Sequence, residues 1–93
     1  MKRIFKYPLP VKDLVFLDLP GGAKVLSVAE QANEIVLYAL VDDEMQSAER
    51  QAFRIVGTGH PCEDVPPMTF LGTVKLYGGT LMFHVFHDAE NPA

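Results

Sequence analysis

Apolar residues in this chain come in short runs separated by turn-forming residues, a pattern typical of strands. Runs of about four to eight residues between Gly, Pro, Asn and Asp clusters indicate an all-β sandwich or barrel. We expect about seven short, mostly antiparallel strands, over residues 3–7, 13–19, 24–29, 35–41, 52–56, 69–77 and 80–87. The fold class predicted is all-β, or mainly β with at most one short helix, as a small sandwich or partly open barrel.

Some of these strands have a predicted place in their sheet. Residues 35–41 are apolar at every position, which favours a strand buried on both faces and therefore central. Pro8 and Pro10 cannot donate ladder hydrogen bonds, so they stop regular pairing or confine the first strand to an edge. Most strands that follow one another in sequence are expected to pair with each other.

The connections carry their own signals. Gly78-Gly79 is the strongest hairpin signal, and residues 31–34 form a second, with Asn33 as the residue for a left-handed conformation. Gly72 predicts a bulge or a close-packing site within its strand. The polar stretch 42–51 is interpreted as a loop or as one helical turn over 47–50. Residues 62–67 should be irregular, and 88–93 a frayed tail.

Length and composition add limits to this picture. Ninety-three residues, 48% of them hydrophobic, suffice for a single β domain over 1–93. The one cysteine, Cys62, cannot form an internal disulfide, and the start of the chain lacks the apolar stretch of a signal peptide. No run reaches the length of a membrane span. These features predict a cytoplasmic protein without membrane association, with a homodimer as one option for a domain this small.

The charge of the chain is polarised along the sequence. Five of the eight Lys and Arg lie in the first 24 residues, whereas residues 25–49 hold six acids and no basic residue, and the net charge is −4. This balance argues against direct nucleic-acid binding, which requires clustered basic residues. Solvated loop charges are one interpretation of the acids. The other is a face that docks onto a basic protein surface, formed by Asp42, Asp43, Glu44 and Glu49.

Candidate chemistry is sparse. His60, Cys62, His84 and His87, with Asp64 nearby, lack the spacings of a structural zinc site, and His84 and His87 should point to opposite faces of a strand. Glu63 and Asp64 beside Cys62 disfavour a thiolate nucleophile. We therefore predict no metal, no cofactor and no catalytic residue, and expect that the protein is not an enzyme.

One glycine-rich stretch remains a candidate ligand site. Gly57, Thr58, Gly59 and His60 resemble an anion-binding nest of backbone amides, and Arg54 could stand beside it. A phosphate loop normally has a helix behind it, which Pro61, Pro66 and Pro67 oppose. The alternative interpretation is a tight turn between two strands.

Several stretches together carry a family likeness. The chain resembles a family of small proteins of unknown function that bacteriophages and prophages encode widely. Its most distinctive match is Gly57-Thr58-Gly59-His60-Pro61, and further matches lie at residues 4–7, 22–28, 38–42, 55–56, 70–74 and 83–86. The resemblance implies a phage or prophage origin and action in the cytoplasm of a bacterial host. It implies no catalytic residues.

Three hypotheses for function follow. The first is a phage accessory protein that binds a host protein. Its specific version is an inhibitor of a defence system such as CRISPR, whose basic nucleic-acid channel an acidic face would complement. The second is a binder of a small, nucleotide-like ligand. The third is a self-assembling structural module of a phage. Convergence of His60, Cys62, His84 and Arg54 on one concave pocket would favour the second.

Overall fold

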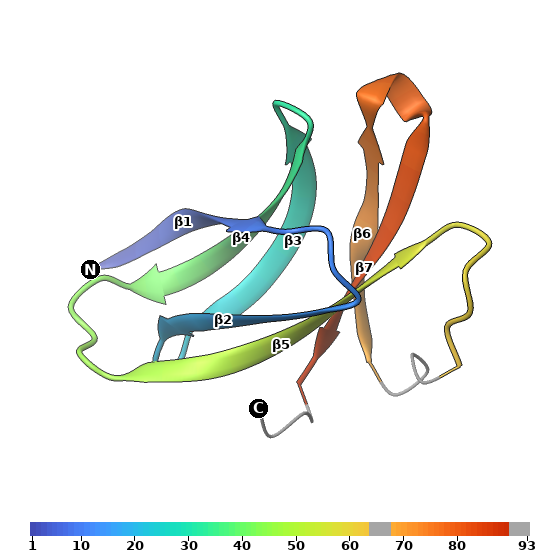
Figure 1. The fold of residues 1–93 in the computed structure, drawn as a ribbon. Helices are drawn as coiled ribbons and strands as arrows, with labels where there is room; N and C mark the ends of the chain where they lie inside the picture. The colour runs from blue at the N-terminus through green and yellow to red at the C-terminus, as the bar shows by residue number, and fades with distance from the viewer. Residues whose placement is uncertain (64–67, 90–93) are drawn as a thin grey trace.

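The computed structural model, which describes residues 1–63 and 68–89, consists of two antiparallel β-sheets packed as a sandwich (Figure 1). The first sheet contains, in order, β1 (Lys2–Leu9), β4 (Glu34–Asp42) and β3 (Lys24–Gln31). The second contains, in order, β2 (Leu14–Pro20), β5 (Ala48–Gly57), β7 (Leu81–Asp88) and β6 (Thr69–Leu76). The predicted all-β sandwich of seven antiparallel strands is confirmed, and the sheets do not close into a barrel.

The core lies between the inner faces of the two sheets. Strand β4 is the middle strand of its sheet, and Ile35, Leu37 and Ala39 are completely buried, which confirms the central position expected from its apolar run. From the second sheet, Phe53 of β5 and Val85 of β7 point into the same core, both fully buried. Apolar area removed from water in this layer is the main stabilising contribution to the fold.

The connectivity differs from the prediction. Only two of the six pairs of consecutive strands, β3–β4 and β6–β7, are hydrogen-bonded neighbours, so the expectation that most consecutive strands pair is wrong. At the other connections the chain crosses to the opposite sheet or to a distant strand of its own sheet. A strand with one apolar face gains more by joining a two-layer core than by extending one sheet. Strand β1 does lie at an edge, and Pro8 is tolerated within it.

The prediction for residues 48–51 is also wrong. This segment is neither a loop nor a helical turn but the first part of β5, and it pairs with β2 from Pro20↔Ala48 to Leu17↔Gln51. A backbone hydrogen bond of 2.9 Å from Gly21 N–H to Ser47 O closes the ladder at its start. Tertiary pairing with β2 outweighs the weak local preference of this polar stretch, as context commonly does for strands.

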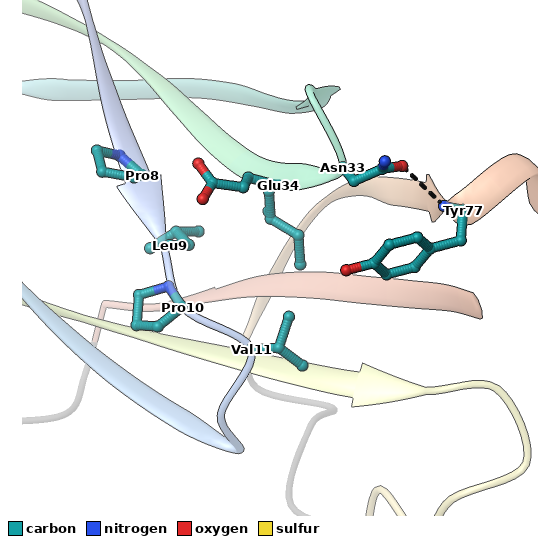
Figure 2. Close-up of a pocket in the computed structure, with 8 residues that line it drawn as sticks. Pro8, Leu9, Pro10, Val11, Asn33, Glu34 and Tyr77 are labelled. Carbon is teal, nitrogen blue, oxygen red and sulfur yellow. Dashed lines mark hydrogen bonds between the residues drawn. The ribbon is translucent and has the colours of Figure 1, made fainter.

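Both predicted hairpins form, and their tips meet. Ala32 and Asn33 have φ values of 52° and 62°, as a two-residue turn of type I′ requires, so the left-handed Asn33 is confirmed. In the β6–β7 hairpin the short 3₁₀ turn η1 (Tyr77–Gly79) makes the connection. The side-chain Oδ1 of Asn33 accepts a 3.1 Å hydrogen bond from the Tyr77 N–H. This bond joins the tips of hairpins that belong to different sheets (Figure 2).

A bulge marks where the two sheets approach most closely along β3 and β6. The register of β6 against β7 shifts between Phe70 and Gly72, which confirms the predicted irregularity at Gly72. A Cβ atom on Gly72 would lie 3.1 Å from Cγ2 of Val28 on β3. Glycine suits this position because its φ is 157°, which L side chains rarely adopt, and because a Cβ would press on Val28.

The two segments expected to be irregular are described only in part. Residues 64–67 and 90–93 lie outside the described residues, and with them Asp64 and most of the proposed tail. The prediction that the tail begins at residue 88 is wrong, because Asp88 is still part of β7 and pairs with Ala52 of β5.

Candidate functional site

The stretch Gly57–His60 is a tight turn at the end of β5. The His60 N–H donates to the Gly57 carbonyl over 3.1 Å, and Gly59 adopts a left-handed φ of 88°. Glycine is favoured at that position of a type II turn because it has no Cβ. The Thr58 N–H donates to the carbonyl of Met82 on β7, at 3.2 Å. Two of the amides of the predicted anion nest therefore already have partners within the protein.

A shallow pocket of about 230 Å³ opens beside this turn. His60, Cys62 and His84 line it together with Phe86, although they come from the turn, the segment after it and β7. Three residues singled out from the sequence thus converge, whereas the fourth, Arg54, does not line this pocket. Arg54 lies within β5, opposite Leu14 on one side and Phe86 on the other.

The imidazole of His84 is held by two hydroxyl groups. Its Nε2 lies 2.8 Å from Oγ1 of Thr58, and its Nδ1 lies 2.9 Å from Oγ1 of Thr73 on β6. Because a threonine hydroxyl can donate or accept, this pair accommodates either tautomer and also the imidazolium. The ring is therefore oriented by two neighbouring elements, and both of its nitrogens have partners within the protein.

His87 faces the other side of the same sheet, as the spacing of the two histidines predicts. Its ring stacks on Phe53 with centroids 5.1 Å apart, and its Nε2 is 2.9 Å from Oε1 of Gln51. Burial lowers the pKa of His87 below its ordinary value, and the nearby charge of Asp88 opposes this only in part. The two histidines cannot share one ligand. Within residues 1–63 and 68–89 no three His, Cys, Asp or Glu side chains are placed to hold a metal ion.

The acidic residues after β4 are paired within the chain. The Met1 amino group lies 3.3 Å from Asp42, 3.2 Å from Asp43 and 3.6 Å from Glu44. Arg3 Nε also donates to Asp43. The hydrogen bond from Arg3 is the main cause of a lowered pKa at Asp43, and the Glu44 N–H has the same effect on Asp42. Hydrogen bonding to Asp43, partly opposed by desolvation, raises the pKa of the Met1 amino group.

Two members of the predicted acidic face nevertheless differ in how they are used. The carboxylate of Glu49 accepts a 2.7 Å hydrogen bond from the Gly22 N–H and so supports the turn after β2. The Glu44 side chain is 81% exposed, although its carboxylate lies 3.6 Å from the Met1 amino group. The acidic residues thus form two separate sets of contacts. Asp42, Asp43 and Glu44 lie beside the positive charges of Met1 and Arg3, and Glu49 is hydrogen-bonded at the turn after β2.

A feature not anticipated from the sequence lies on the outer face of the second sheet. Phe16 and Arg50 come from β2 and β5, and the Arg50 guanidinium carbon lies 4.4 Å from the centroid of the Phe16 ring. Across the sheet, Phe70 of β6 and Phe86 of β7 meet with centroids 5.4 Å apart. Phe70 is 55% exposed. We call these four residues the aromatic platform.

The strand register explains why the platform was missed. Phe16 and Arg50 lie on the same face because Phe16 pairs with Ala52 and Asp18 with Arg50, and the Arg54↔Phe86 and Phe86↔Phe70 pairs extend that face to β6. The alternation within residues 52–56 and 81–88 shows which side chains share a face of each strand. It shows which aromatic residues lie side by side only when the partner strands are known.

Two layers of antiparallel strands, with an aromatic platform on one outer face and a small pocket at one end, define a β-sandwich domain with several accessible surfaces for binding. The model of a family described as a domain of unknown function (DUF7352) matches residues 1–93, and the chain belongs to this family. This confirms the likeness to an uncharacterised family. No curated protein and no solved structure matches the chain. Among the described residues, no helix is both long and apolar enough to cross a membrane.

Proposed function

We propose that this protein is a phage-encoded accessory protein that binds a host protein, and that the aromatic platform is its contact surface. The observation that carries the proposal is the contact between Phe70, which is 55% exposed, and the half-buried Phe86, on a sheet face that also presents Arg50 over Phe16. Aromatic residues and arginine are enriched at the energetically dominant positions of protein interfaces. Rings attached to a paired sheet lose little conformational entropy on binding.

The charge distribution supports the same proposal. Arg50 and Arg54 lie on the platform face together with Asp18, which is opposite Arg50 in the register of β2 and β5. A partner surface that combines apolar area with acidic groups would complement the platform, and electrostatic complementarity sets specificity and the association rate. The specific version that we propose is an inhibitor of a bacterial defence complex such as a CRISPR effector. Its support is separate from the charge of the platform: it is the acidic group Asp42, Asp43 and Glu44, which would complement a basic nucleic-acid channel.

Affinity capture from a lysate of the bacterial host tests the contact surface. We expect the wild-type chain to retain one host protein that Phe70→Ala binds about thirtyfold more weakly, since loss of an interface hot spot costs about 2 kcal/mol. Phe5→Ala is the matched control, because Phe5 is 40% exposed but lies on β1 of the other sheet. Absence of a specific partner, or equal loss in both variants, would contradict the proposal.

The anti-defence version has a separate test in cells. Expression of the chain should raise the plating efficiency of a phage that CRISPR immunity targets, and Phe70→Ala should lose this effect whereas Phe5→Ala keeps it. If plating is unchanged while the captured partner is genuine, the partner belongs to another host process and the defence assignment is withdrawn.

A second candidate function is supported by the convergence of His60, Cys62 and His84 on one pocket. The pocket is large enough for one planar ring or one phosphate group, and His84 is oriented by two hydroxyls. A nucleotide-like ligand should then raise the melting temperature of the wild type, with saturation at 100 times Kd contributing about 2.7 kcal/mol. His84→Phe should abolish the rise. A flat response over a nucleotide panel would remove this candidate.

A further inference from the structure

A second concave site lies where the connection from β1 to β2 passes under the tips of the two hairpins. The cavity has a volume of about 500 Å³, within the range of small-molecule sites. Leu9 and Ile35 line it and are 3% and 0% exposed, so they belong to the packed core as well. Pro8 and Pro10 line the side formed by the β1–β2 connection, and their rings hold the backbone there in one conformation.

Tyr77 lines the opposite side in an unusual backbone conformation. Its φ is 52°, in the left-handed region that a bulky residue rarely adopts, although two glycines follow it immediately. The conformation is held by the Asn33 side chain on its N–H and by Thr80, whose N–H and Oγ1 both donate to the Tyr77 carbonyl, at 3.2 and 2.9 Å. Strain of this kind at a non-glycine residue is concentrated at ligand sites.

The chemistry of the cavity wall selects the charge of a ligand. Among the described residues that line it, Glu34 is the one charged side chain, and none is basic. Figure 2 shows the Glu34 carboxylate directed toward Pro8, while the Tyr77 hydroxyl is directed toward Val11. The acidic group and the phenol thus lie at separate ends of an apolar cavity.

We propose that this cavity binds a small ligand with an alkylammonium group and an apolar stem. The ammonium would donate hydrogen bonds to the Glu34 carboxylate, a charge-assisted contact in a partly apolar surrounding. The stem would lie in the cavity between the proline rings and the ring of Tyr77, which stands at the end away from the ammonium. None of these residues belongs to the aromatic platform, so the proposed ligand site and the proposed protein contact are independent and can be tested separately.

Three six-carbon probes of similar length test the charge requirement. In ¹H–¹⁵N spectra and calorimetry, hexylammonium should bind saturably and shift the amide signals of Glu34, Ile35 and Tyr77. Hexanoate should not bind, and hexanol should bind more weakly than hexylammonium. Raising NaCl from 50 to 500 mM should weaken hexylammonium binding, since salt screens a carboxylate near the surface. Equal binding of hexanoate or hexanol, or shifts located elsewhere, would overturn the proposal.

Two variants separate recognition from folding. Glu34→Gln should weaken hexylammonium binding about five- to tenfold, whereas Glu44→Gln, which removes one charge from an 81% exposed side chain outside this cavity, should leave it unchanged. Tyr77→Gly removes the ring but suits the left-handed backbone, so it should lose binding without lowering the melting temperature. If Glu34→Gln and Glu44→Gln bind hexylammonium alike, the carboxylate does not recognise the ligand and the assignment fails.

Discussion

His87 shows how one side chain can link stability to pH. The ring is half-buried against Phe53, and its Nε2 donates toward Gln51. Burial disfavours the charged imidazolium, so the pKa of His87 in the folded protein lies below the ordinary value of 6.5 that applies to the unfolded chain. As the pH falls through 6.5, the unfolded chain takes up this proton first. The folded state therefore loses stability until the lower folded pKa is passed.

We accordingly expect the urea midpoint of the wild type to fall between pH 7.5 and pH 5.5 by more than that of His87→Gln, which cannot titrate. His60→Gln is the control, because it removes one imidazole from an exposed turn and leaves the contacts of His87 with Phe53 and Gln51 in place. A pH dependence that is unchanged in His87→Gln would show that another group carries it.

At the scale of single elements, the hairpin tips and the bulge in β6 decide how the sheets meet. Glu30 accepts a 2.7 Å hydrogen bond from the Asn33 N–H, which supports the turn from which Asn33 reaches Tyr77. The bulge at Gly72 brings the β6 backbone next to Val28, within a distance that leaves no space for a methyl group without movement. The hydrogen bond between the hairpin tips and the bulge at Gly72 both position one sheet against the other, rather than stabilise a single strand.

Gly72→Ala should destabilise the protein by about 1–2 kcal/mol, because the new methyl group overpacks against Val28. The measurement is the free energy of unfolding in urea. In a Val28→Ala background the same substitution should cost less, since the opposing Cγ2 atom is gone. Equal costs in the two backgrounds would mean that the penalty arises from the backbone of Gly72 and not from the contact.

At the scale of the whole molecule, a thin two-layer sandwich depends on one shared core. The molecule measures 40 × 29 × 16 Å, and the shortest dimension corresponds to two sheets with their side chains. Leu37 occupies the middle of β4 and is completely buried. The two sheets therefore unfold together when this layer is disturbed, in the cooperative manner of small domains.

Leu37→Ala should lower the free energy of unfolding by about 2–5 kcal/mol, the cost of lost burial and of the cavity left behind. Because this loss is a large fraction of the total free energy of unfolding of a small domain, we expect a large fall in melting temperature. Leu26→Ala, at a position 40% exposed on β3, should change stability by about 0.5 kcal/mol or less. Similar losses in the two variants would show that β4 does not form the centre of the core.

The local pattern was enough to predict the strands and most turns. Strand alternation, Asn33 in its hairpin, Gly72 in its bulge and the fully apolar 35–41 all depend on residues close in sequence, and the structure confirms each. The candidate site was found in part. His60, Cys62 and His84 do meet. The tight turn that the sequence offered as the alternative forms and uses the His60 amide, but nothing local indicated that the Thr58 amide would donate to Met82.

Which strands become neighbours was decided only by the tertiary structure. Alternation tells which side chains share a face of one strand, but not which strand lies beside it, because register and crossing between sheets depend on the burial of all apolar faces at once. For this reason the strand character of 48–51 and the aromatic platform were out of reach of the sequence. The cavity beneath Tyr77 likewise exists only because the β1–β2 connection and two hairpin tips from different sheets are brought together.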